Sequence, residues 1–230
     1  NNTPLSNDIS TLFTDADGMI WIGYANGLSK FNPRDRTFHH YVSGSQNMPI
    51  TGTIGGFTQT PDATIWAATE KAGLLKIEPQ DGSMTPLRHN PDDSNSIPSD
   101  WLIDLTTSDD GKIWLASANA GASLYDPNYN IATNFKHLES DIHSLSSDQV
   151  TSIYEDDEAR IWIATLDGLN LYIPTENHFL RYTNQNSGLQ ENFITSVYQT
   201  REGKYWIGTL SSLVSGMKTE FHTFNRTIGH

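Results

Sequence analysis

The 230-residue chain has 36% hydrophobic residues, a formal net charge of −13 and no cysteine. The negative charge argues against nucleic acids and anionic membrane surfaces as partners, because binding to either is driven by basic residues. The lack of cysteine excludes disulfides, thiolate catalysis and cysteine-bound zinc, and no apolar run is long enough for a membrane-spanning helix.

One sequence frame recurs five times along the chain, each time centred on a tryptophan. The copies lie 44 to 48 residues apart, at Trp21, Trp66, Trp114, Trp162 and Trp206. The first copy reads Gly-Met-Ile-Trp-Ile-Gly at 18–23, and the fifth reads Gly-Lys-Tyr-Trp-Ile-Gly at 203–208. A period of this length indicates a repeat architecture, in which periodic aromatic residues pack in the core.

Within each copy the apolar residues alternate with period two, which is typical of β-strands. The first copy predicts, in order, a strand at 9–14, an acidic turn at 15–18, the tryptophan strand, a turn at Asn26-Gly27, a strand at 28–31 before Pro33, and a strand at 37–41. Asn-Gly and Asp-Gly favour hairpin turns because they tolerate positive φ.

The later copies repeat this order, with a proline after the third strand at Pro79, Pro127 and Pro174. The fifth copy departs after its tryptophan strand, where 211–218 lacks both the aromatic residue and the proline. Four short strands per copy predict an all-β fold, a β-propeller of five four-stranded antiparallel blades in one domain, 1–230. The expected blades are approximately 5–49, 50–97, 98–145, 146–189 and 190–230.

The frame from Asp15 to Pro33, Asp-x-x-Gly-x-Ile-Trp-Ile-Gly-x-x-x-Gly-Leu-x-x-Phe-x-Pro, resembles the two-component regulator propeller repeat, and 156–174 repeats it more loosely. The resemblance implies the periplasmic sensor region of a bacterial membrane-bound histidine kinase, hybrid kinase or diguanylate cyclase. It also implies a small-molecule ligand, carbohydrate fragments among the candidates, and as partners the rest of the receptor and a second copy. Family propellers have about seven blades, so the five copies either close a ring or belong to a larger array; we expect the latter.

The expected ligand site lies on one face of the propeller, where the loops entering each first strand meet the turns between strands two and three. Trp101 is the one tryptophan outside the repeat frame, and Tyr24 and Phe193 stand where other copies carry small or polar residues. An aromatic ring at a loop mouth can stack on the apolar face of a ligand. The predicted ligand-binding residues are Trp101, Tyr24, Asp100, Asn119, Asp167, Asn192 and Phe193. The alternatives are that Trp101 plugs the space under loop 90–98 and that the polar residues only form turns.

No nucleophile-elbow, phosphate-loop or zinc-protease motif is present, so we expect no catalytic residue and no cofactor. The acidic turns at 15–18 and 156–158 lack the spacing of a calcium-binding loop, and the histidines on expected outer strands are dispersed, so we expect no metal. Two other functions stay open. One is a hydrolase or lyase that pairs Asp100 with Asp148 or Asp167 at the channel mouth, and the other is a protein-interaction platform without a small ligand.

Overall fold

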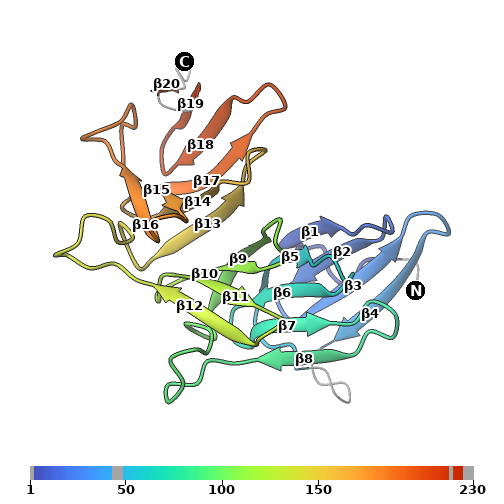
Figure 1. Ribbon diagram of the computed structural model, residues 1–230. Helices are drawn as coiled ribbons and strands as arrows, with labels where there is room; N and C mark the ends of the chain where they lie inside the picture. The colour runs from blue at the N-terminus through green and yellow to red at the C-terminus, as the bar shows by residue number, and fades with distance from the viewer. Residues whose placement is uncertain (1–2, 43–48, 218–219, 225–230) are drawn as a thin grey trace. The chain divides into compact units, whose positions relative to one another are not determined.

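The computed structural model describes residues 3–42, 49–217 and 220–224. In these residues the chain forms twenty strands in five four-stranded antiparallel sheets (Figure 1). This arrangement confirms the predicted all-β fold, and each sheet is one blade. None of the described residues belongs to a helix with the length and hydropathy needed to cross a membrane.

Each blade uses its four strands in chain order, so that neighbouring strands are joined by short turns. Blade 1 contains β1 (Thr11–Thr14), β2 (Ile20–Tyr24), β3 (Gly27–Asn32) and β4 (Thr37–Val42). Blade 2 contains β5 (Ile54–Gln59), β6 (Ile65–Thr69), β7 (Gly73–Ile77) and β8 (Met84–Leu87). Blade 3 contains β9 (Leu102–Thr107), β10 (Ile113–Ser117), β11 (Ala122–Asp126) and β12 (Ile131–Phe135). Blade 4 contains β13 (Val150–Glu155), β14 (Ile161–Thr165), β15 (Gly168–Ile173) and β16 (His178–Tyr182). Blade 5 contains β17 (Ile194–Gln199), β18 (Tyr205–Thr209), β19 (Leu213–Met217) and β20 (Glu220–Phe224).

The chain divides into two compact units. The first comprises 1–115 and 123–134, and the second comprises 116–122 and 135–230. Blades 1 and 2 therefore lie in the first unit, as does most of blade 3, while blades 4 and 5 lie in the second.

The tryptophan of blade 1 packs in the interface between blades 1 and 2. Trp21 is fully buried, stacks on Tyr41 of its own blade and contacts Phe57 of the next, both at 6.3 Å between ring centroids. Trp66 packs likewise against Tyr125 of blade 3, at 5.7 Å. Burying an aromatic side chain at each interface joins sheets that could not bury both faces alone.

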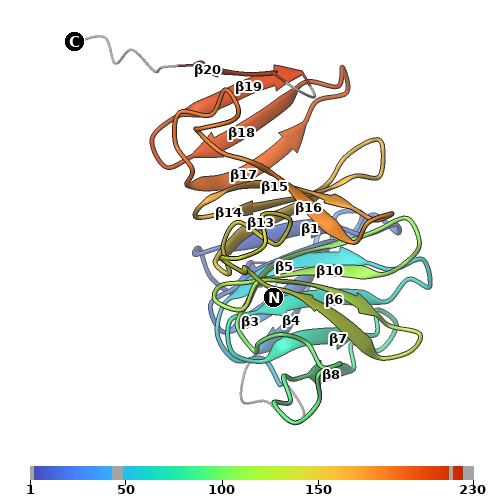
Figure 2. The ribbon, with the colours of Figure 1, turned by 60° about the vertical axis from the view of Figure 1, so that its left-hand side comes forward.

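The second unit repeats this packing, and its two blades lie face to face (Figure 2). The ring of Trp162 lies 5.7 Å from that of Tyr182 and 5.2 Å from that of Tyr205 in the next blade. Trp114 is also buried, which agrees with the core role predicted for the repeat tryptophans. Trp206 is only partly buried, and the ammonium of Lys204 lies 4.8 Å from its ring centroid.

Two of the loops between blades run back along the outer strand of the following blade. The carbonyl of Asn95 accepts a hydrogen bond from the N–H of Ala132 in β12 at 2.7 Å. The carbonyl of His143 accepts one from Phe179 in β16 at 2.8 Å. These bonds pair main-chain groups on strands at the edges of their sheets, where unpaired groups invite association with other chains.

Candidate functional site

Asp100, a predicted site residue, holds the loop that enters β9. Its Oδ1 atom accepts a hydrogen bond from the N–H of His89 at 2.8 Å, and its carbonyl accepts one from Gly73 at 3.1 Å. Its Oδ2 atom pairs with Nη1 of Arg88 at 3.1 Å, and Arg88 also donates to the carbonyl of Lys71. The carboxylate therefore organises the loop, and it leaves the Arg88 side chain fixed but half-exposed.

The residues equivalent to Asp100 in the next two copies stabilise the corresponding loops of the second unit in the same way. Asp148 accepts a hydrogen bond from the N–H of His137 at 2.7 Å, and Asn192 accepts one from the N–H of Asn184 at 2.8 Å. Their carbonyls accept hydrogen bonds from Gly121, which directly precedes β11, and from Gly168, the first residue of β15. Because these carboxylates and this amide already accept main-chain N–H groups, their primary role is to fold the loops.

Trp101 is the predicted site residue that presents an apolar surface to solvent. It follows Asp100 directly and precedes the first residue of β9, and its side chain is 45% exposed. Its main-chain N–H donates to Oγ of Ser99 at 3.0 Å, which anchors the backbone beneath the ring. An exposed indole therefore directly follows, in the chain, the carboxylate that pairs with Arg88.

Tyr24 occupies a different environment from the one expected for a site residue. Its side chain is 2% exposed, and its hydroxyl accepts a hydrogen bond from the N–H of Leu5 at 3.3 Å. At the equivalent position Thr69 and Thr165 use their hydroxyls to close the next turn. Tyr24 instead fills space inside the first unit, so packing explains its aromatic ring.

The remaining predicted residues belong to the second unit. Asn119 and Asp167 are exposed on turns between second and third strands, and Phe193 is partly buried before β17. The Nδ2 group of Asn192 donates to Oδ1 of Asp167 at 2.9 Å, which brings these two predicted residues together. The structure thus places Tyr24, Asp100 and Trp101 in one unit and the other four in the second.

The acidic turns are hairpin turns built around their first carboxylate. In blade 1, Oδ1 of Asp15 accepts the N–H groups of Asp17 and Met19, and Oδ2 accepts the indole N–H of Trp21 at 2.8 Å. Asp156 does the same for Trp162 in blade 4. Among the described residues no three His, Cys, Asp or Glu side chains are grouped so as to hold a metal ion.

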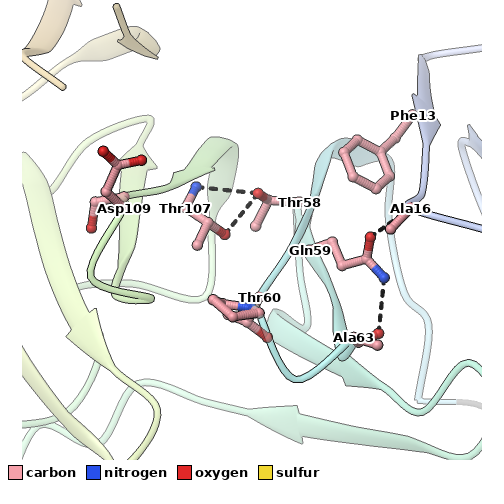
Figure 3. Close-up of a pocket in the computed structure, with 10 residues that line it drawn as sticks. Phe13, Ala16, Thr58, Gln59, Thr60, Ala63, Thr107 and Asp109 are labelled. Atoms are coloured by element: carbon pink, nitrogen blue, oxygen red, sulfur yellow. Dashed lines mark hydrogen bonds between the residues drawn. The ribbon is translucent and has the colours of Figure 1, made fainter. Parts of the chain in front are cut away.

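A groove that the sequence analysis did not predict lies at the far ends of β1, β5 and β9, next to the acidic turns (Figure 3). Its volume is about 490 Å³, and Phe13 forms one wall. Gln59 bridges two turns there, accepting the N–H of Ala16 at 2.8 Å and donating to the carbonyl of Ala63 at 3.2 Å. The hydroxyl of Thr58 also meets that of Thr107 across blades 2 and 3 at 2.8 Å. Three of its polar side chains, those of Thr58, Gln59 and Thr107, thus link neighbouring blades.

A second groove lies between blades 2 and 3, and we call it the interblade groove. It has a volume of about 600 Å³, within the ~300–1,000 Å³ typical of ligand sites. Apolar and charged side chains both line it, namely Trp66, Leu87, Tyr125, Pro61, Pro127, Asp62, Lys76 and Asp110, with Thr60, Thr85, Gly111, Asn128 and Asn130. Comparison of the copies could have indicated it, because Leu87 stands where blades 1 and 4 have Tyr41 and Tyr182.

Comparison with known proteins identifies the repeat. The model of the two component regulator propeller family matches residues 3–26, 144–167 and 188–211. These segments fall in blades 1, 4 and 5, and each ends in the turn after a tryptophan strand. No curated protein sequence matches the chain.

Solved structures with a similar fold come from proteins of different roles. The extracellular domain of a putative hybrid two component system of B. thetaiotaomicron is 22% identical, with a TM-score of 0.60, and the match covers 96% of this chain and 36% of that one. PorZ, a surface component of the type-IX secretion system of Porphyromonas gingivalis, is 19% identical with a TM-score of 0.72, over 94% and 32%. Virginiamycin B lyase from Staphylococcus aureus is 13% identical with a TM-score of 0.71, over 98% and 72%.

At these identities the structural matches establish the fold alone. The chain spans about a third of the length of the first and second of these structures. The repeat assignment instead rests on the sequence matches to the family model. The chain therefore has the fold of a β-propeller, and three of its five blades contain a repeat that matches the two component regulator propeller model.

Proposed function

We propose that the chain is an extracytoplasmic ligand-sensing segment of a bacterial membrane-bound signalling receptor, and that its ligand contacts Trp101. The family repeats support the receptor, and the extracellular domain of a hybrid two component system shares the fold. The observation that carries the site is the 45% exposed indole of Trp101, the residue that directly follows Asp100, the partner of Arg88.

The surroundings of Trp101 suit a small ligand that has both an apolar face and polar groups. The indole offers a flat surface for stacking. Within the described residues the Arg88 guanidinium contacts Asp100 and Lys71 through Nη1, and its remaining N–H groups can donate to a ligand. The backbone beneath both residues is hydrogen-bonded, so little loop entropy is lost on binding. A carbohydrate has the required combination of apolar face and hydroxyl groups.

The contacts of the two carboxylates at this loop position, Asp100 and Asp148, favour a binding function over a catalytic one. A glycosidase needs one carboxyl group that accepts or donates a proton and a second that stabilises charge. Asp100 accepts a main-chain N–H and pairs with Arg88, and Asp148 accepts a main-chain N–H. Both carboxylates are thus already engaged in holding the backbone of their own loops. In this role the segment would pass its ligand state to the rest of the receptor and to a second copy.

Calorimetry of the purified chain with a panel of oligosaccharides and small metabolites tests this function. A ligand bound by the native chain should bind at least tenfold more weakly to Trp101→Ala, because the stacking surface is lost. Tyr129→Ala is the matched control, since Tyr129 is 76% exposed on the turn before β12. Equal affinity for the native chain and Trp101→Ala would place the site elsewhere. Turnover of a glycan that disappears in Asp100→Asn would establish an enzyme instead.

A further inference from the structure

The interblade groove has a counterpart in the same unit, between blades 1 and 2, and there the chain fills the space itself. The ammonium of Lys30 donates to the carbonyl of Pro79 in the next blade at 3.0 Å. It also lies 5.2 Å from the ring centroid of Trp21. A carbonyl oxygen and an indole face are both attractive to a cation, so this interface holds an alkylammonium group as a built-in occupant.

The residues that hold Lys30 have equivalents at the interblade groove, but the lysine is oriented differently. Trp66, Lys76 and Pro127 of the groove lie at the repeat positions of Trp21, Lys30 and Pro79. Lys76 forms an ion pair with Glu78 in its own blade, at 2.9 Å. The residue two positions after Lys30 is the uncharged Asn32. Glu78 therefore draws the ammonium of Lys76 to its own blade, an attraction that Lys30 does not experience.

A second substitution between the copies opens the space further. In blade 1 the ring of Tyr41 stacks on Trp21 with an interplanar angle of 15°. In blade 2 the equivalent residue on the last strand is Leu87, which is smaller and partly exposed. Tyr125 approaches Trp66 edge-on from blade 3, with an interplanar angle of 66°, and it becomes a wall of the groove. Between blades 1 and 2 this space is filled by the stacked ring of Tyr41 and the stem of Lys30. Between blades 2 and 3 the equivalent space is open.

The rim of the groove is acidic. Asp62 and Asp110 occupy the same position in the turns of adjacent blades. Burial by itself raises the pKa of Asp62, but hydrogen bonds from Thr60 and Thr64 outweigh it, and the pKa is lowered overall. The pKa of Asp110 is lowered in the same way, with burial opposed by hydrogen bonds from Lys112 and Ser108. Both carboxylates are therefore ionised at neutral pH. Asp110 already pairs with the ammonium of Lys112 at 2.7 Å, so Asp62 supplies the charge that attracts a further cation.

We propose that the interblade groove binds an alkylammonium group, carried by a lysine side chain of a peptide or by a free aliphatic amine. The ammonium would lie at the carbonyl of Pro127 and over the ring of Trp66, as the ammonium of Lys30 lies at the carbonyl of Pro79 and over the ring of Trp21. The alkyl stem would lie along Leu87 and the ring of Tyr125. This site is separate from Trp101 and does not depend on the proposed sensing function.

The direct test is a nuclear magnetic resonance titration of the native chain with n-butylamine, which is the lysine side chain without its backbone. The reporter is the indole N–H signal of Trp66, which donates to the hydroxyl of Thr60 at 3.0 Å and can be assigned with Trp66→Phe. We expect this signal to shift with n-butylamine and not with 1-butanol, which has the same stem without the charge. Equal shifts with both compounds, or none with either, would overturn the proposal.

Substitutions within the groove provide the matched controls. Asp62→Asn should weaken n-butylamine binding by about two- to five-fold, the range expected for one exposed ion pair. Asp17→Asn changes the equivalent residue of blade 1 and should leave binding unchanged. Lys76→Met should tighten binding, because it removes a like charge from the groove. Leu87→Tyr restores the residue of blades 1 and 4 and should block binding.

Two further probes distinguish the source of the ammonium group. Tighter binding of Nα-acetyl-lysine N-methylamide than of 1,5-diaminopentane would indicate a peptide, and the reverse order would indicate a free amine. Trp101→Ala should bind n-butylamine like the native chain, so a failure of the sensing proposal would leave this result intact. Loss of n-butylamine binding in Trp101→Ala would overturn the assignment to the interblade groove.

Discussion

The phenolic hydroxyl of Tyr205 donates a hydrogen bond to Oδ2 of Asp156 at 2.6 Å, joining blade 5 to the acidic turn of blade 4. The same oxygen accepts the indole N–H of Trp162 and the Nε–H of Arg160, both at 2.7 Å. The side chain of Asp156 is fully buried. A buried carboxylate with this many donors is stable only while each donor is in place.

Removal of the Tyr205 hydroxyl should therefore destabilise the second unit. We expect Tyr205→Phe to lower the free energy of unfolding by about 1–3 kcal/mol, because a buried charged acceptor loses one of its donors. Urea denaturation followed by tryptophan fluorescence measures this change. Tyr198→Phe is the control, since Tyr198 is 57% exposed on β17, and it should change the stability by less than about 0.5 kcal/mol.

The same network makes stability depend on pH in the acid range. Burial raises the pKa of Asp156, but hydrogen bonds from Tyr205, Trp162 and Arg160 lower it overall, from 3.8 to about 2. Because the folded pKa lies below the unfolded value, the ionised carboxylate stabilises the fold above about pH 4. This contribution, about 2 kcal/mol, should be lost as the pH falls from 4 through 2. The difference in unfolding free energy between the native chain and Asp156→Asn should shrink over that interval. A difference that is constant between pH 5 and pH 2 would contradict this account.

Trp162 should contribute more to stability than Trp101, although both are tryptophans. Trp162→Ala removes a fully buried ring that contacts two tyrosines, and it should cost about 3–5 kcal/mol. Trp101→Ala removes an exposed ring and should cost less than about 0.5 kcal/mol. Denaturant titration of both variants checks the contrast, and similar midpoints for the two would mean that the repeat tryptophan is not a core residue.

Substitution of two glycines with positive φ can distinguish the cost of backbone strain from the cost of steric overlap. Gly73 has a φ of +73°, and a Cβ atom there would lie 2.3 Å from the carbonyl oxygen of Leu87 on the neighbouring strand. Gly18 has a φ of +77°, but nothing lies within 4 Å of the corresponding position. Gly18→Ala should therefore cost about 1 kcal/mol from backbone strain alone, and Gly73→Ala at least about 2 kcal/mol. Thermal denaturation of the two variants measures the difference, and an equal cost would show that strand β8 moves to make room.

Local features of the sequence determined the five four-stranded sheets and the core role of four of the five repeat tryptophans. Strand period, turn dipeptides and the recurring frame depend on residues close together in the chain, so they can be read without a structure. The same information located Trp101 as an exception, and its side chain is exposed.

Contacts between distant residues were decided only by the tertiary structure. Tyr24 departs from the repeat pattern as Trp101 does, yet it is buried, because burial depends on the volume that other segments leave around a side chain. The hydrogen bond between Asp156 and Tyr205 joins residues 49 positions apart, and the interblade groove arises because Leu87 replaces a tyrosine while Glu78 draws Lys76 aside. Periodicity places a residue on one face of a strand, but only the packing of neighbouring blades sets the space and charge that face it.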